Sequence, residues 1–175
     1  MIYYISNELS GKLEIKLAKW KRWVREFLPP DPLGGFQSGY ARQFSLKDAF
    51  RVFLGGVLVG TMKFTVPEAR RILNDLHPWM KANGFYAMRV GDHGIAPAEE
   101  RFYRIYIYPL ASTKFGYTIR GVFSSTAVNE DERTETYHAT VLGSSSDRIA
   151  TGEAETARVL GISRLYAHFL SRLAR

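Results

Sequence analysis

Apolar and polar positions alternate with two different periods along the chain, and the change of period separates a helical first half from a strand-rich second half. Up to about residue 76, apolar residues recur three and four positions apart, as on the buried face of an amphipathic helix. Ser45 and Thr65 each precede such a run and are expected N-caps. After a short opening helix, we expect further helices over residues 12–28, 45–60 and 65–76.

From Phe85 onward the period falls to two, which is typical of β-strands. Turn-rich stretches separate the runs, and short connections favour an antiparallel sheet. The expected strands cover residues 85–90, 101–110, 115–123 and 134–142. An amphipathic helix is expected over residues 152–174, where it would cover the sheet or pair with its copy in a second subunit. The predicted fold class is therefore α+β, with a helical domain over 1–84 and a small antiparallel-sheet domain with a C-terminal helix over 85–175.

The helix expected over residues 12–28 has a cationic face. Its basic residues are Lys12, Lys16, Lys19, Lys21, Arg22 and Arg25, against Glu14 and Glu26. The surrounding half is also basic: residues 1–84 hold 13 Lys and Arg and 7 Asp and Glu, a net charge of +6. Residues 85–175 hold 11 and 10, a net charge of +1. This asymmetry predicts that the first half faces a polyanion.

The order of the expected elements indicates which polyanion. A short helix, a basic helix over about 12–28, a Gly-rich aromatic hairpin over about 33–44 and two more helices form a winged helix-turn-helix layout. The major groove of duplex DNA admits one α-helix. A cationic helix there replaces condensed counterions, and a hairpin, or wing, reaches the neighbouring backbone. We therefore expect double-stranded DNA as the partner, with the basic helix as recognition helix.

Three stretches resemble the MerR-type regulators. Lys21–Pro29, KRWVREFLP, is similar to the family's recognition-helix run RYWEREFP. Ser38–Ser45, SGYARQFS, is similar to its Gly-Tyr-Arg-x-Tyr-Ser wing, and residues 60–73, GTMKFTVPEARRIL, to its next helix. The resemblance covers about residues 5–76 and implies a winged helix-turn-helix transcriptional regulator. A homodimer is also expected, since a DNA site made of two half-sites is bound by two recognition helices, one from each copy.

Two of the chain's departures from the family pattern concern the wing and the helix that normally follows the domain. Ala41 looks like an insertion in the wing motif that displaces Arg42 by one position. The family's long dimerising helix is not expected here, because Pro78 should stop or kink the helix before it and Asn83–Gly84 follow.

The resemblance and the charge pattern together give a set of candidate DNA contacts. Lys21 and Arg22 correspond to positions where the family's helix touches DNA, and Arg25 to a phosphate contact. Tyr40 and Arg42 correspond to wing contacts. The charge pattern alone adds two more residues, Lys16 and Lys19. Two aromatic residues of the same helix are expected in the core rather than stacked on bases, namely Trp20 and Trp23.

Two alternatives remain open. Residues 156–173, TARVLGISRLYAHFLSRL, match the pattern of a second helix-turn-helix with Gly161 at the turn. A single packing or dimerising helix is the favoured interpretation, because no third supporting helix precedes it. The aromatic strands could instead line a pocket. In that case the protein would be a small-molecule-binding or protein-interaction module with no DNA role.

The sequence contains little evidence for other classes of function. The four histidines are scattered, with no HExxH pair, and Cys is absent, so we expect no metal site and no cofactor. No paired carboxylates or phosphate-binding loop suggest an enzyme. No run of about 18 apolar residues occurs, so no membrane span is expected, and a membrane is not among the expected partners. The opening residues do not resemble a signal peptide, and a cytoplasmic regulator with a possible small-molecule effector is expected.

Overall fold

The structure is a computed structural model that describes residues 3–31, 41–86, 99–111, 114–126 and 133–175. The described residues form six helices and two antiparallel sheets, which confirms the expected mixture of helix and sheet. The chain divides into two compact units, one of Met1–Gly91 with His168–Arg175 and one of Asp92–Ala167. The last eight residues, which the sequence assigned to the second domain, thus group with the first.

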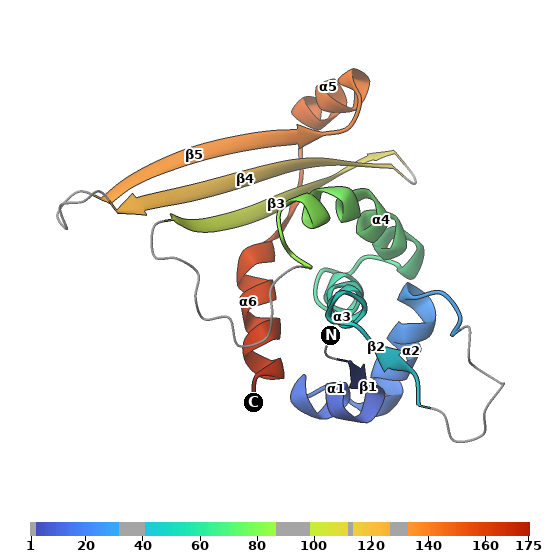
Figure 1. The fold of residues 1–175 in the computed structure, drawn as a ribbon. Helices are drawn as coiled ribbons and strands as arrows, with labels where there is room; N and C mark the ends of the chain where they lie inside the picture. Colours follow the sequence, from blue (N-terminus) through green and yellow to red (C-terminus); the bar gives the residue numbers. More distant parts are fainter. Residues whose placement is uncertain (1–2, 32–40, 87–98, 112–113, 127–132) are drawn as a thin grey trace. The chain divides into compact units, whose positions relative to one another are not determined.

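Unit 1 contains four helices and a two-stranded sheet among its described residues (Figure 1). Its strands pair antiparallel, with Tyr4 opposite Phe44 and Ile5 opposite Gln43. The pairing ties the start of the chain to the segment before the third helix. The elements are β1 (Tyr4–Ile5), α1 (Ser6–Lys12), α2 (Leu17–Phe27), β2 (Gln43–Phe44), α3 (Leu46–Gly60) and α4 (Val66–Ala82).

The expected N-caps of α3 and α4 are confirmed. The Ser45 hydroxyl accepts a hydrogen bond from the backbone N–H of Asp48, 3.2 Å away. Thr65 and Glu68 form a capping box, in which the Thr65 backbone N–H donates to Glu68 Oε2 at 2.7 Å and the Glu68 N–H to Thr65 Oγ1 at 3.4 Å. These bonds satisfy donors that the first helical turn leaves without partners.

Two expected helix boundaries are wrong. The helix predicted over 12–28 is interrupted, because α1 ends at Lys12 and α2 begins at Leu17. Glu14 between them has a left-handed φ of 55°, which no helix can accommodate. Pro78 does not stop α4, which continues to Ala82. The loss of one backbone hydrogen bond there is offset by burial of apolar side chains on both sides, Leu76 and Met80.

The core of unit 1 is largely aromatic and aliphatic. Trp20 of α2 is fully buried and meets the ring of Phe44 edge-on, with centroids 6.0 Å apart. Phe169, in the returning C-terminal segment, packs against Phe50 at 5.2 Å and Phe53 at 5.4 Å. Each such side chain contributes roughly 1.5–3 kcal/mol through burial. The core thus includes residues more than a hundred positions apart in sequence.

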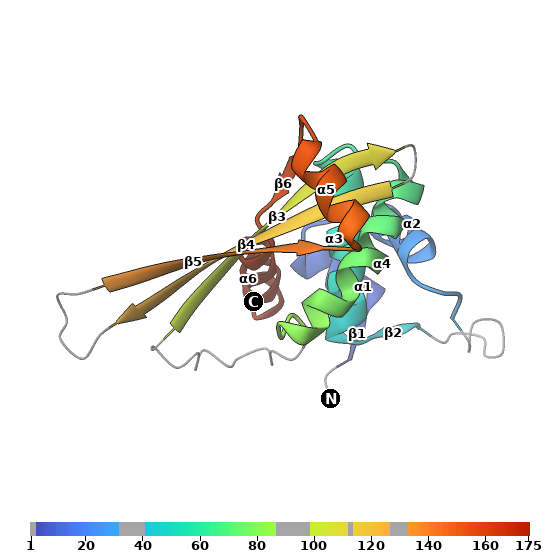
Figure 2. The same ribbon diagram turned by 90° about the horizontal axis from the view of Figure 1, so that it is seen from above.

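Unit 2 contains a four-stranded antiparallel sheet in the order β5-β4-β3-β6 (Figure 2). Its strands are β3 (Glu99–Ala111), β4 (Lys114–Thr126), β5 (Arg133–Leu142) and β6 (Arg158–Leu160). The first three confirm the strands expected at 101–110, 115–123 and 134–142. The strand expected at 85–90 lies mostly outside the described residues, and Phe85 and Tyr86 form a turn.

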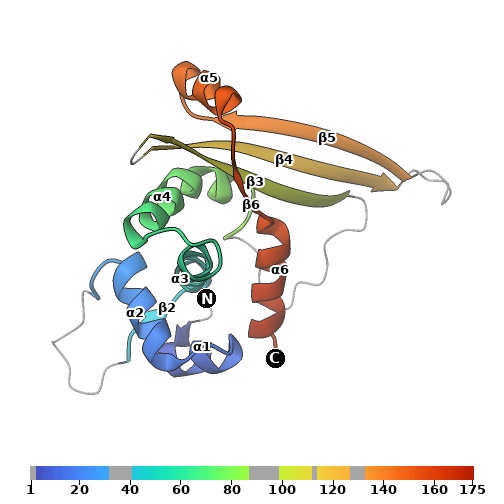
Figure 3. The same ribbon diagram turned by 180° about the vertical axis from the view of Figure 1, so that it is seen from behind.

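Close packing occurs on both faces of this sheet. Ile105 of β3 lies opposite Ile119 of β4, and both are buried. Helix α5 (Ser145–Glu153) lies against β4 (Figure 3), where a Cβ added to Gly116 would overlap the Thr151 hydroxyl. A glycine at this position therefore allows the close approach of α5.

The helix predicted over 152–174 is wrong. Helix α5 ends at Glu153, β6 follows at Arg158–Leu160, and α6 covers only Ile162–Leu173. Residues 158–160 are extended because they pair with Ile105, Tyr106 and Ile107 of β3. The second helix-turn-helix considered for 156–173 is also wrong, since its first helix is a strand.

Candidate nucleic-acid interface

Helices α1 and α2 are joined by four residues, 13–16, and this junction contacts the end of the chain. Arg172 Nη1 lies 2.7 Å from Glu14 Oε2 and donates to the Leu13 carbonyl at 3.3 Å. Lys12 Nζ donates to the Leu173 carbonyl at 3.0 Å. No local sequence pattern indicates this role for Arg172, because the partners are separated by more than 150 residues.

Helix α2 has one buried and one exposed face. Trp20, Val24 and Phe27 point into the core of unit 1. The exposed face consists of Ala18, Lys19, Lys21, Arg22 and Arg25. Residues three and four apart share a face of a helix, so the side chains of Ala18, Lys21, Arg22 and Arg25 lie next to one another. The sequence prediction that Trp20 belongs to the core is confirmed, and Trp23 is half-buried.

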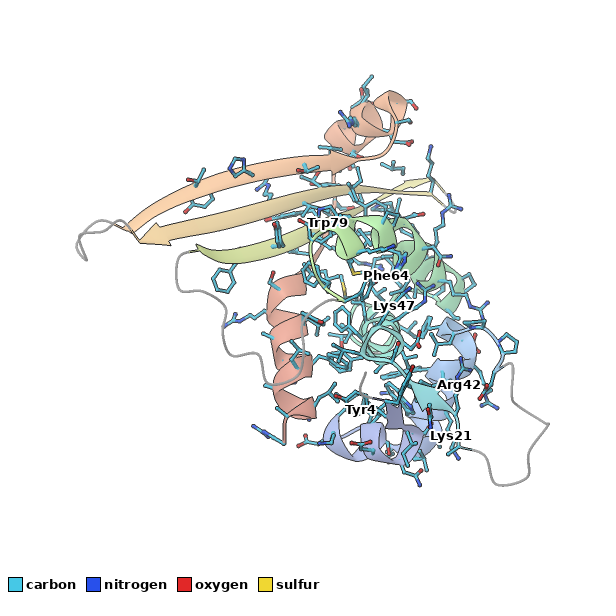
Figure 4. All side chains as sticks on the ribbon, in the orientation of Figure 1. Tyr4, Lys21, Arg42, Lys47, Phe64 and Trp79 are labelled. Atoms are coloured by element: carbon cyan, nitrogen blue, oxygen red, sulfur yellow. The ribbon has the colours of Figure 1, made fainter. Side chains whose placement is uncertain are left out.

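A hollow next to this face brings three predicted contact residues together. Lys21 and Arg25 of α2 and Arg42, just before β2, all line it. Figure 4 labels Lys21 and Arg42, the former on α2 and the latter beside β2. Arg42 lies over the Phe44 ring, with its guanidinium carbon 5.6 Å from the ring centroid. The β1–β2 pairing places Phe44 opposite Tyr4, just before α1, and Arg42 lies two residues before Phe44.

The other predicted residues lie around this hollow or outside the described part. Arg22 is exposed on α2 but does not line the hollow. Lys16 is the N-cap residue of α2 and lies just before the helix. The sequence prediction had placed it inside the helix. Lys19 lies over the Trp23 ring, 4.9 Å from its centroid. Tyr40 and the rest of the expected wing up to residue 40 are outside the described residues.

Acidic residues near α2 do not cancel its positive charge. Glu26 pairs with Arg70 of α4 at 2.6 Å, and the same arginine donates to the Glu26 carbonyl at 2.6 Å. Among the described residues that line the hollow of Lys21, Arg25 and Arg42, Asp31 is the one carboxylate. Three cations against one anion make this an anion-attracting surface.

Metal-binding clusters and membrane-spanning helices are both absent from the part of the chain that the structure describes. There, no three His, Cys, Asp or Glu side chains are grouped so that they could hold a metal ion. None of the helices described is both long and apolar enough to cross a membrane.

Comparisons of the chain with protein-family models, curated proteins and solved structures find no match. The case for a function consequently depends on the geometry and charge of the residues themselves.

Proposed function

We propose that the protein is a sequence-specific regulator of transcription that binds double-stranded DNA through α2. The observation that carries the proposal is the exposed cationic face of α2, joined by Arg42 at the hollow beside it. In this reading α1 and α2 are the helix-turn-helix, and the segment that leads into β2 is the wing.

The dimensions and charge of α2 suit a major groove. Its 11 residues correspond to roughly 16 Å, enough to follow the groove over several base pairs. Lys21, Arg22 and Arg25 would make the charge-assisted contacts, whereas Trp20 and Phe27 fix the helix to the core. Lys16 and Lys19, closer to the start of α2, would add contacts to the phosphate backbone.

The order of elements also supports a MerR-type arrangement as part of the proposal. A short helix, α2, a segment ending in β2, and then α3 and α4 follow one another as in the sequence motifs that resemble that family. A homodimer on a two-fold symmetric site belongs to the same proposal, because each copy reads one half-site.

Selection of bound duplexes from a random DNA library tests the proposal directly. We expect a consensus sequence with two half-sites, and binding measured by fluorescence anisotropy that weakens as salt increases. The double variant Lys21→Ala/Arg22→Ala should lose most of this affinity. A matched control is Lys81→Ala, an exposed cation in the last turn of α4. Absence of affinity at low salt, or equal affinity of the double variant and the wild type, contradicts the proposal.

A further inference from the structure

A second hollow adjoins the first at the end of α2. The two share Arg25 and the run Leu28–Pro30. The second hollow also reaches the first turns of α3 and the middle of α4. Those helices contribute Lys47, Asp48, Arg51, Arg70, Asn74 and His77. Most of these side chains are polar or charged, which distinguishes the site from an ordinary packing defect.

Two hydrogen bonds fix the Arg51 side chain, and they do not use all of its N–H donors. Its Nε donates to the Phe27 carbonyl at 2.9 Å and its Nη2 to Asn74 Oδ1 at 2.6 Å. These two bonds leave Nη1 without a partner among the described residues, although a guanidinium has five N–H donors. Partial burial lowers the pKa of Arg51, yet an arginine remains charged at neutral pH. The hollow therefore contains a fixed, partly desolvated cation with free donors.

The charge around Arg51 is predominantly positive. Lys47 lies over the Tyr86 ring, with Nζ 5.7 Å from the centroid, and Arg25 and Arg70 also line the hollow. Its two carboxylates are already engaged. Glu26 pairs with Arg70, and Asp48 accepts a hydrogen bond from the Ser45 hydroxyl at 2.7 Å.

His77 responds to this positive charge. Its Nδ1 lies 3.1 Å from the Tyr86 hydroxyl. Burial lowers the pKa of His77 most, and the charges of Lys47, Arg51 and Lys81 lower it further. Burial also raises the pKa of Tyr86 to about 12, so the phenol stays neutral. The ring of His77 thus provides a titratable reporter inside the hollow.

We propose that this second hollow binds a phosphate group, with Arg51 and Lys47 as its principal ligands. A guanidinium whose position is already fixed forms charge-assisted hydrogen bonds to phosphate oxygens at little entropic cost, and an ammonium beside it adds a second charge. The phosphate is either that of a free phosphorylated small molecule or one in a DNA backbone that passes the end of α2. The chemistry is the same for both, and the site is defined without reference to DNA.

Inorganic sulfate and phosphate are suitable probes, with chloride at matched ionic strength as the control. The His77 ring and the Arg51 Nε–H are followed by NMR in the full-length protein. We expect saturable shifts with both dianions and a rise in the pKa of His77, because a bound anion favours the imidazolium. Lys47→Gln changes an exposed side chain and should weaken sulfate binding at least about tenfold.

Lys21→Gln is the matched variant, since it removes the same charge from the first hollow. It should leave sulfate binding unchanged while weakening duplex binding. A duplex that displaces sulfate identifies a backbone phosphate as the occupant, and one that binds with sulfate retained identifies a free phosphorylated ligand. Shifts no larger than those with chloride, or equal sulfate affinity of Lys47→Gln and wild type, overturn the phosphate site. Saturable sulfate binding without any duplex binding contradicts only the DNA proposal.

Discussion

The indole ring of Trp23 lies directly against the backbone of Gly56, so close that a Cβ at position 56 would overlap it. The neighbouring Gly55 meets the ring of Phe27 in the same way, with a Cβ placed 2.5 Å from that ring. Two glycines in mid-helix lower helix propensity, as the sequence indicates. The two glycines allow α2 to approach α3 closely. This contact packs the cationic helix against α3.

Substitution Gly56→Ala should therefore destabilise unit 1 by about 1–3 kcal/mol through overpacking. All three tryptophans of the chain, Trp20, Trp23 and Trp79, lie in this unit, so urea unfolding followed by tryptophan fluorescence reports on it. Gly60→Ala is the control, because nothing lies within 4 Å of a Cβ there. It should be neutral or slightly stabilising. Equal midpoints for the two variants would show that the helices can separate without cost.

The sequence predicts a structural feature well when the residues that determine the feature are close together in the chain. Caps such as Ser45 and Thr65 were predictable, because each depends on a partner three residues away. The break at Glu14 was not, because its ion pair with Arg172 joins distant parts of the chain. For the same reason residues 158–160 read as helix, although pairing with β3 makes them a strand.

The candidate interface was predictable to a similar degree. The resemblance to the MerR-type motif, together with the charge pattern, was enough to select Lys21 and Arg25 on α2. The position of Arg42 beside them follows from the pairing of Tyr4 with Phe44, which no local pattern reveals. The hollow around Arg51 was missed altogether, because its lining comes from three helices whose relative placement the sequence does not encode locally.

If α2 binds DNA, the salt dependence of binding should count its phosphate contacts. Arg25→Gln should reduce the slope of log affinity against log salt by about one, because each neutralised phosphate contributes about 0.9. Duplex affinity measured by fluorescence anisotropy at several salt concentrations gives the slope. Lys81→Gln should leave it unchanged. A slope that falls equally in both variants would mean that net charge alone, and not the face of α2, determines binding.

Unit 2 should lose stability in acid through Asp147. Lys114, paired with it, and Ser144, which donates to it, lower the pKa of Asp147 from 3.8 to about 2. Because the folded pKa is the lower one, this stabilisation is present above about pH 4 and is lost as the pH falls towards 2.

A carboxyl NMR titration of wild type and Lys114→Gln measures the effect. The pKa of Asp147 should rise in the variant, because the hydrogen bond from Lys114 is the largest cause of its lowered pKa. The hydrogen bonds from Ser144 should still keep the pKa below the ordinary value. Arg148→Gln, an exposed neighbour on α5, is the charge-matched control and should not change the titration. If Asp147 titrates at the same pH in all three proteins, the Lys114 pairing is not what holds the carboxylate charged.

The C-terminal segment should be essential to the domain that carries α2. Phe169 is fully buried between Phe50 and Phe53, and Phe169→Ala should cost about 3–5 kcal/mol of unit 1 stability. Ser171→Ala, an exposed position on the same helix, should stay within about 0.5 kcal/mol of wild type. Urea unfolding monitored by tryptophan fluorescence compares the two. A small effect of Phe169→Ala would mean that α1 to α4 form a complete core without the end of the chain. A large one would show that the core of unit 1 needs the side chain of Phe169.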